Sequence, residues 1–364
     1  MALRLAVVGT GLIGASVALA ARHGGAHVLG WDLDPGALDA ALAREAIDAR
    51  ADSLEDAVAQ AELVVVAAPI AALPDQVVAV LAAPGDATVT DVGSTKASVV
   101  TAAGGSPRFV GGHPLSGGES RGAERASADL FSGATWFLTP TAQTESARHR
   151  LVHGFVQSLG AIPVAIDPIA HDRLVALTSH VPHVLANVVA NQTGASRIDG
   201  HEPLANAGGS LRDMTRIAGA NPRIWVDILL DNADAVRAAL GEHRRLIEQV
   251  ETALAAGDAG FLARWIGEAA GNRRRMLEQA YPDAGALHRV RIHVPDRPGV
   301  LAAITQALGA ERINIEDFEL QHMSPDRGGT LTVLVTGEDD AERAARLLEA
   351  QGYGVVVTAV ADED

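Results

Sequence analysis

The chain contains no cysteine among its 364 residues. Disulfide bridges and catalysis by a thiol are therefore excluded. Because stabilising disulfides belong to oxidising compartments, their absence fits a protein that works in the cytoplasm, and we expect that location.

Basic residues are also scarce, since 29 Lys and Arg stand against 45 Asp and Glu and give a formal net charge of −16. Such a charge repels a nucleic-acid backbone and an anionic bilayer alike. No apolar run reaches the roughly 18 residues that a membrane-spanning helix needs, and the N-terminus has neither the charged start nor the cleavage site of a signal peptide. We therefore expect neither a nucleic-acid nor a membrane partner.

Apolar residues are plentiful at 48%, enough to fill the cores of two or three domains. Over residues 1–165, β-branched runs such as "LRLAVVG" and "LVVVAAP" alternate with alanine-rich stretches, which predicts a doubly wound parallel α/β sheet. Over residues 166–284 apolar residues recur at helical spacing, which predicts an all-α domain. Residues 288–364 follow a β-α-β-β-α-β order, the ferredoxin-like arrangement.

A glycine-rich turn follows the first expected strand. In "VVGTGLIG" the spacing G-x-G-x-x-G is formed by Gly9, Gly11 and Gly14, with Leu12 and Ile13 between the last two. Glycines at this spacing allow a tight turn and let a pyrophosphate rest on the N-terminus of the following helix. A glycine turn without a ligand is the alternative, but the strand before and the helix after predict a Rossmann-type dinucleotide site.

The next strand, "HVLGWD", ends in Asp32, 18 residues beyond Gly14. A carboxylate there binds the ribose hydroxyls of NAD and repels the 2′-phosphate of NADP, and neither Leu33 nor Asp34 supplies a compensating cation. We therefore predict NAD as the cofactor. Pro69, which ends "VVVAAP", is either a cofactor contact or simply the start of a loop.

Two further strands of the sheet end in polar residues. Ser94 lies in "DVGSTK" and His113 in "GGHP", so both are expected at neighbouring carboxyl ends, where open α/β sheets bind ligands. A solvated loop histidine is the alternative for His113.

The helical region carries two polar pairs at a spacing of four residues. Ser179 and His183 in "TSHVPH" are predicted to share a helix face, with Pro182 loosening the local backbone hydrogen bonding. Arg212 and Arg216 in "LRDMTRIA" form the second pair. Each pair is either a solvated polar face or part of a pocket, and a guanidinium suits a small anion through its bidentate geometry.

Together these motifs resemble the prephenate dehydrogenases that carry a C-terminal ACT domain. The resemblance covers essentially the whole chain and rests, in order, on "GTGLIG", "DVGSTK", "GGHPLSGGE", "TSHVPH", "LRDMTRIA" with "NPRIW", and "DRPGVLA". It implies NAD-dependent oxidative decarboxylation of prephenate to 4-hydroxyphenylpyruvate in tyrosine biosynthesis. It also implies a homodimer and no metal.

The same resemblance implies roles for individual residues. His113 accepts the hydroxyl proton of the substrate, Ser94 orients it, and Arg216 binds a substrate carboxylate. His183 and Ser179 line the side-chain end of the pocket. Glu119 lies near the cleft entrance and pairs with Asp213 or Arg212.

In the C-terminal region, the resemblance places an amino-acid effector, tyrosine before phenylalanine, near Gly299 and Asn314 at a paired ACT interface. The alternative is that this domain only holds the oligomer together. Two other functions also remain open at this point. One is arogenate dehydrogenase, which makes tyrosine directly, and the other is a non-catalytic sensor of NAD and an amino acid.

Overall fold

The computed structural model describes residues 2–116, 122–280, 287–324 and 328–360. Its backbone forms two compact units, Met1–Arg244 and Arg245–Asp364. The division between them falls inside the long helix α11 (Ala233–Ala256).

The first unit is built on an eight-stranded sheet with the order β3-β2-β1-β4-β5-β6-β7-β8. The chain order reverses between β1 and β4, and in open α/β sheets ligands bind outside the carboxyl ends of the strands at such a point. The strands are β1 (Arg4–Val8), β2 (His27–Trp31), β3 (Ala49–Arg50), β4 (Leu63–Val66), β5 (Thr88–Asp91), β6 (Phe109–Pro114), β7 (Thr135–Thr139) and β8 (Ile162–Ala165).

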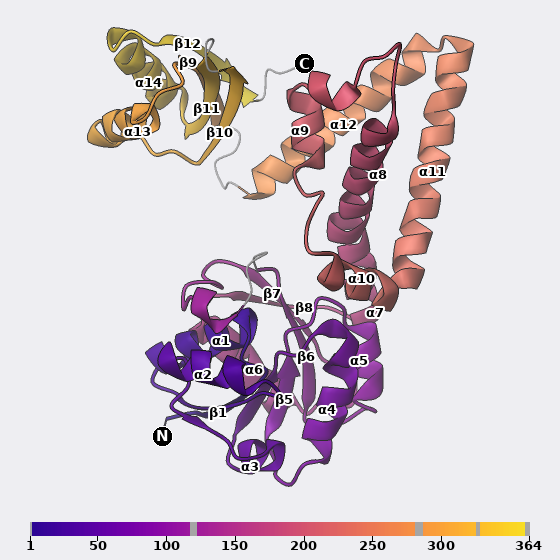
Figure 1. The fold of residues 1–364 in the computed structure, drawn as a ribbon, viewed down its shortest axis with the longest axis vertical. Helices are drawn as coiled ribbons and strands as arrows, with labels where there is room; N and C mark the ends of the chain where they lie inside the picture. Colours follow the sequence, from indigo (N-terminus) through magenta and orange to yellow (C-terminus); the bar gives the residue numbers. More distant parts are fainter. Residues whose placement is uncertain (1, 117–121, 281–286, 325–327, 361–364) are drawn as a thin grey trace. The chain divides into compact units, whose positions relative to one another are not determined.

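Helices cover both faces of this sheet (Figure 1). Because side chains alternate along a strand, Leu5 and Val7 of β1 pack in one buried cluster and Ala6 and Val8 in another. The first cluster includes α1 (Leu12–His23), α2 (Pro35–Ala43) and α6 (Ser146–Ser158), and the second includes α3 (Leu54–Ala59), α4 (Leu73–Ala82) and α5 (Ala97–Ala102). The predicted Rossmann-type fold is confirmed.

Two strands differ from the expected all-parallel sheet, because β7 runs antiparallel to β6 and β8 runs in the same direction as β7. The segment between these strands contains a short 3₁₀ turn, Ala123–Arg125, and no long helix in its described part, and β7 starts from the end of the sheet at which β6 stops. β8 then pairs parallel to β7. This arrangement leaves the segment after His113 at the carboxyl edge of β6.

The rest of the first unit is helical, as predicted. Buried Ala176, Val181, Val236 and Ala239 form its small core. The elements are α7 (Pro168–Val175), a π-helical turn (Ala176–His180), α8 (Val181–Ala195), α9 (Gly209–Thr215), α10 (Pro222–Asp231) and the start of α11.

The second unit carries the four-stranded antiparallel sheet β10-β11-β9-β12 with two helices, drawn in orange and yellow in Figure 1. Its β-α-β-β-α-β order confirms the predicted ferredoxin-like domain. Before it lies α12 (Ala259–Ala280), whose Leu277 packs against buried Leu287 and Leu334. The other elements are β9 (Leu287–Val294), α13 (Val300–Ala310), β10 (Asp317–Ser324), β11 (Gly328–Thr336), α14 (Glu338–Ala350) and β12 (Gly354–Ala359).

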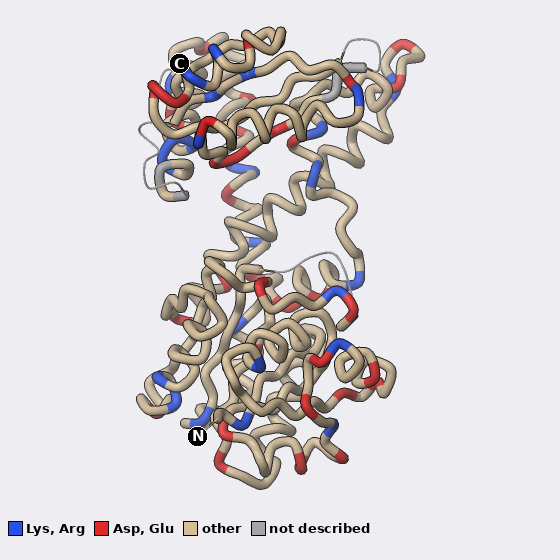
Figure 2. The backbone as a smooth tube through the Cα atoms, turned by 90° about the vertical axis from the view of Figure 1, so that its left-hand side faces the viewer, with Lys and Arg blue, Asp and Glu red and all other residues tan. Residues whose placement is uncertain are grey.

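Acidic and basic residues interleave along both units, as Figure 2 shows in red and blue. Within the described part of the chain, helices long and apolar enough to cross a membrane are not found.

Candidate active site

The glycine turn after β1 has the geometry that a dinucleotide site needs. Gly9 has φ = +93°, and a Cβ there would lie 2.5 Å from the carbonyl oxygen of Ala67. A Cβ on Gly14 would lie 1.9 Å from the carbonyl oxygen of Gly9, whereas one on Gly11 would meet nothing within 4 Å. Gly9 and Gly14 are thus required by the protein's own packing, and Gly11 faces open space at the N-terminus of α1, where a pyrophosphate would lie.

The residues around this turn are arranged for a nucleotide. Leu12 and Ile13 form the half-buried first turn of α1. Asp32 follows β2, and its Oδ2 accepts hydrogen bonds from the backbone N of Thr10 at 2.6 Å and from Thr10 Oγ1 at 3.2 Å. These bonds hold the carboxylate beside the glycine turn. Pro69 is exposed in the loop after β4.

A buried ion pair lies under the ends of β5 and β6. Lys96 is the only lysine in the sequence, and it pairs with Asp91. Both side chains are 0% exposed. Lys96 Nζ also donates to the Gly112 carbonyl oxygen at 2.8 Å, and Asp91 Oδ1 accepts from the Gly112 backbone N at 3.0 Å. The pair therefore holds the peptide groups directly before His113.

The glycines of "GGHP" are required by the close packing of β6. Gly111 and Gly112 are buried against protein. A Cβ on Gly111 would lie 2.3 Å from Thr139 Oγ1, and one on Gly112 would lie 2.5 Å from the Asp91 carbonyl oxygen. They allow β6 to approach β7 and the Asp91 region closely.

His113 is the first member of a chain of three hydrogen-bonded side chains. Its Nδ1 lies 2.9 Å from Nε2 of His171, and Nδ1 of His171 lies 2.8 Å from Oδ1 of Asp172. His113 is half-buried near the end of β6, whereas His171 and Asp172 are buried on α7. Ser94 is half-buried in the loop after β5, the strand that pairs with β6.

The surroundings favour a neutral imidazole at this position. Burial lowers the pKa of His113 well below its ordinary value, and the nearby His171, Lys96 and His180 lower it further. Burial also lowers the pKa of Lys96, although the Asp91 carboxylate opposes that change. A neutral imidazole is the form that can accept a proton.

The second histidine cluster lies where α8 and α10 meet. The ring of His183 stacks on Trp225 with centroids 3.6 Å apart and planes 3° apart, and the ring of His180 meets the same indole edge-on at 6.1 Å. His180 Nδ1 lies 3.1 Å from Asn232 Nδ2. Burial lowers the pKa of His180 to about 4, with the nearby Asp172 opposing the change. Both imidazoles are therefore held in place by packing.

The predicted pairing of Ser179 with His183 on one helix face is wrong. Ser179 is exposed and His183 is buried. The cause is the π-helical turn Ala176–His180 before Pro182, which widens the helix by a residue and turns His180 inward in place of Ser179. The local loosening expected from the proline is thus present.

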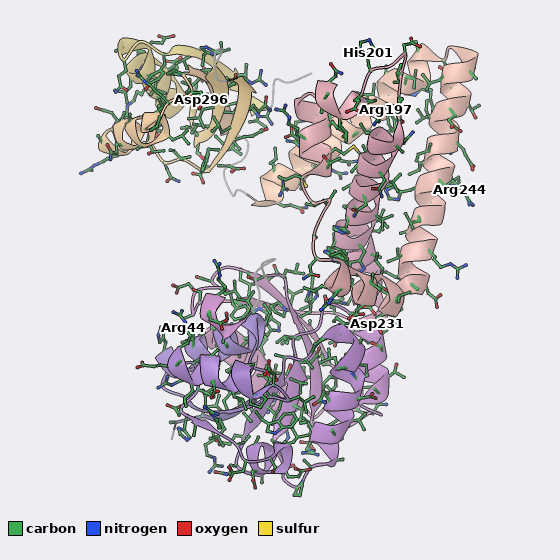
Figure 3. All side chains as sticks on the ribbon, viewed as in Figure 1. Arg44, Arg197, His201, Asp231, Arg244 and Asp296 are labelled. Atoms are coloured by element: carbon green, nitrogen blue, oxygen red, sulfur yellow. The ribbon has the colours of Figure 1, made fainter. Side chains whose placement is uncertain are left out.

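Helix α10 is joined to the sheet domain as well as to α8. Ser98 Oγ of α5 donates to Asp231 Oδ2 at the end of α10 at 2.7 Å, and Figure 3 labels Asp231 there. Asn232, the next residue, donates from Nδ2 to the Asp172 carbonyl oxygen at 2.8 Å. The helices that carry His171 and Trp225 are therefore connected through polar side chains.

The remaining predicted residues lie elsewhere or cannot be placed. Arg216 is the C-cap residue that follows α9, and it is exposed, as is Arg212. None of the contacts above reaches either arginine. Glu119 lies outside the described residues. Gly299 has φ = +89° at the start of α13, and the exposed Asn314 donates to Glu316 Oε1 at 2.8 Å.

Four residues of the site carry no sequence signal that predicts them: His171, Asp172, His180 and Trp225. The dipeptide "HD" at residues 171–172 belongs to no motif of defined spacing. Only the packing of α7 against the sheet brings His171 to His113. Among the described residues, no group of His, Asp and Glu side chains has the arrangement of a metal site.

Three family models match the chain in order. They describe the nucleotide-binding domain of prephenate dehydrogenase over residues 17–164, its dimerization domain over residues 167–268, and the ACT domain over residues 288–352. The curated prephenate dehydrogenase of Bacillus subtilis is 34% identical over 359 residues, which make up 95% of this chain and 95% of that protein.

Solved structures agree with these matches. A Synechocystis arogenate dehydrogenase aligns with a TM-score of 0.70 at 26% identity, over 75% of this chain and 100% of that one. The A. aeolicus prephenate dehydrogenase, solved in complex with hydroxyphenyl propionate and NAD+, aligns with a TM-score of 0.69 at 27% identity, over 76% of this chain and 99% of that one.

Proposed function

Because this chain belongs to the prephenate dehydrogenase family, we propose that it catalyses the NAD-dependent oxidative decarboxylation of prephenate to 4-hydroxyphenylpyruvate in tyrosine biosynthesis. The observation that carries this proposal is His113, a neutral imidazole near the end of β6 whose Nδ1 is already engaged by His171. Its Nε2 is left for the substrate.

NAD is the cofactor, and it would supply the hydride acceptor for the ring carbon that carries the hydroxyl group. Gly9, Gly11 and Gly14 leave room for the pyrophosphate at the N-terminus of α1, and Asp32 is placed for the ribose hydroxyls.

His113 is the general base of the proposed reaction. Its Nε2 accepts the hydroxyl proton as the hydride leaves, which allows the ring oxygen to become a carbonyl. When the ring loses carbon dioxide, the electron pair of the broken carbon–carbon bond moves into the ring. The oxygen then takes the proton back and the ring becomes aromatic. Ser94, on the loop after the neighbouring strand, donates a hydrogen bond to the same oxygen.

Substrate binding is assigned to the helical part of the chain. Arg216 forms a charge-assisted hydrogen bond with a substrate carboxylate. His183, fixed by its stacking on Trp225, lines the side-chain end of the pocket, with Ser179 at its exposed margin. Glu119, expected to act at the cleft entrance, lies outside the described residues and is given no partner.

Arogenate, the aminated form of prephenate, is the second candidate substrate. It is favoured by one observation, the TM-score of 0.70 to an arogenate dehydrogenase. A spectrophotometric assay of four combinations, prephenate or arogenate with NAD+ or NADP+, decides between the two. We expect the highest kcat/KM with prephenate and NAD+, and no turnover in any combination would instead favour a non-catalytic sensor.

The assembly and regulation proposed here follow from the domain matches. A dimerization domain supports a homodimer, and an ACT domain supports an amino-acid effector. We assign tyrosine to the region of Gly299 and Asn314, and the cytoplasm as the compartment. The proposed domain limits are residues 1–165 for NAD, 166–284 for substrate and dimerization, and 288–364 for regulation.

A further inference from the structure

The proposed reaction gives no role to His171 and Asp172, which continue the chain of hydrogen bonds that begins at His113. That chain begins at the half-buried His113 and ends at two side chains inside the protein, with His171 0% exposed. The groups around His171 determine which of its two ring nitrogens donates a hydrogen bond and which one accepts.

Asp172 sets that direction. Its Oδ1 accepts from the backbone N of Lys96 at 2.8 Å, and its Oδ2 accepts from the backbone N of Ala97 at 2.8 Å. An ionised carboxylate has no proton to donate, so Nδ1 of His171 must be the donor in the 2.8 Å contact with Oδ1. In a neutral His171 the lone pair then lies on Nε2.

The lone pair of His171 determines the tautomer of His113. Because Nε2 of His171 is an acceptor, Nδ1 of His113 must carry a hydrogen and donate it across the 2.9 Å contact. A neutral His113 then has its lone pair on Nε2. That nitrogen is the one free to accept a substrate proton.

Neighbouring rings keep His171 in this position. Its ring meets Phe137 edge-on with centroids 5.3 Å apart and planes 81° apart, and it meets His113 with centroids 5.1 Å apart and planes 75° apart. Phe137 lies on β7, directly opposite His113 in the β6–β7 pair. The β6–β7 pair therefore supplies two side chains, His113 and Phe137, that pack against the ring of His171.

We propose that His171 is a positioning residue that holds His113 in its Nδ1–H tautomer and shares its proton during the reaction, an inference that rests on the proposed role of His113 as the base. When the substrate proton arrives at Nε2 of His113, the Nδ1 proton is shared with Nε2 of His171. Nδ1–H of His171 remains bonded to Asp172, so the positive charge is offset by that carboxylate. The protons move back when the product oxygen recovers its own.

The first test reads the tautomer directly in the full-length protein. Solid-state NMR of protein labelled with ¹⁵N-histidine distinguishes protonated from unprotonated ring nitrogens, and His113→Asn assigns the His113 signals. We expect a proton on Nδ1 and a bare Nε2 for His113 near pH 7.5. A proton on Nε2 with a bare Nδ1 would overturn the proposal without any mutation of His171.

The second test compares two variants of His171 that both carry an amide but differ in side-chain length. In His171→Gln the side-chain oxygen reaches the place of Nε2 and can still accept from His113. In His171→Asn the amide reaches only the place of Nδ1, so it keeps the contact with Asp172 and loses the one with His113. We expect a loss in kcat of about 10²-fold or more for His171→Asn, as when a catalytic imidazole loses its orienting partner, and at least tenfold recovery in His171→Gln.

Two measurements distinguish a positioning role of His171 from a general structural role. The KM for NAD+ should stay within about twofold in both variants, and the Nδ1–H signal of His113 should persist in His171→Gln but not in His171→Asn. His149→Asn, a half-buried histidine on α6, is the matched control and should change neither kcat nor the His113 signals.

Equal kcat in the Gln and Asn variants would show that the hydrogen bond to His113 has no part in catalysis. If His113→Asn itself keeps normal turnover, the proposed base is wrong, while the NMR tautomer still decides whether His171 orients it. The failure of one proposal is therefore distinguishable from the failure of the other.

Discussion

In the proposed mechanism, His113 is the residue on which the reaction depends most directly. His113→Asn keeps a polar side chain near the end of β6 but removes the group that accepts the hydroxyl proton. We expect kcat to fall by about 10² to 10⁴, the usual contribution of a general base, with an unchanged Kd for NAD+ measured by fluorescence titration. Near-normal turnover would remove His113 from the mechanism.

The pH dependence follows from the pKa of the same residue. Burial, with His171, Lys96 and His180 nearby, lowers the pKa of His113 below 6.5, so the active neutral form persists to lower pH than for an exposed histidine. As pH falls, kcat/KM should therefore decrease only below pH 6.5, and it should show no ionisation of this residue between about pH 7 and 8. A rise centred at or above pH 6.5, measured under buffers of constant ionic strength, would contradict this assignment.

We expect Asp32 to determine the preference for NAD+ over NADP+. Its carboxylate is held by Thr10 beside the glycine turn, so the 2′-phosphate of NADP would meet a fixed negative charge. We expect Asp32→Ser to narrow the ratio of kcat/KM for NAD+ over NADP+ by about tenfold or more, equivalent to roughly 1.4 kcal/mol. Asp34→Ser, which changes the neighbouring acid that caps α2, is the control and should leave the ratio unchanged. An unaltered ratio in Asp32→Ser would place cofactor selection elsewhere.

At the scale of elements, the Asp91–Lys96 pair joins β5 to β6 beneath the site. Lys96→Met removes one partner of a fully buried ion pair and leaves the Asp91 carboxylate in the interior. We expect a loss in the free energy of unfolding of about 3 to 5 kcal/mol, measured by urea denaturation. Lys96→Met combined with Asp91→Asn should recover part of that loss, because the uncompensated charge is gone. A double variant less stable than the single one would mean that the hydrogen bonds to Gly112 matter more than the charge.

The elements that could be predicted from sequence are those with a local signal. The glycine turn, the Asp32 position and the β-α-β-β-α-β order of the second unit each depend on residues within one or two elements. The direction of β7 could not be predicted, because a strand has the same side-chain alternation whichever way it runs. The π-helical turn could not be predicted either, because one extra residue in a helical turn leaves no mark on the amino-acid composition. This turn nevertheless places His180 in the interior and Ser179 at the surface.

The site was predictable only in part, for a related reason. His113 and Ser94 follow strands whose ends must meet at one edge of a parallel sheet, so their neighbourhood follows from topology. His171 reaches His113 from a helix 58 residues further along the chain, and no spacing rule connects them. Residues that orient a catalytic group through tertiary packing are therefore the ones that sequence patterns miss.

At the scale of the whole molecule, the ACT domain is where a response to tyrosine is expected. Isothermal calorimetry on the full-length protein should detect tyrosine binding, and Asn314→Ala should weaken it. Coupling between two sites is reciprocal in free energy, so prephenate should weaken tyrosine binding by the same factor by which tyrosine weakens prephenate binding. If neither tyrosine nor phenylalanine binds at millimolar concentration, the domain is an assembly element.

The single, fully buried lysine has a practical consequence for chemical labelling. Acylating reagents such as N-hydroxysuccinimide esters attack unprotonated amines that solvent can reach. Apart from the terminal amine, the only primary amine of this chain is Lys96, which is 0% exposed. In the folded protein such reagents should leave Lys96 unmodified. Acylation of Lys96 would then report the opening of the segment between β5 and β6.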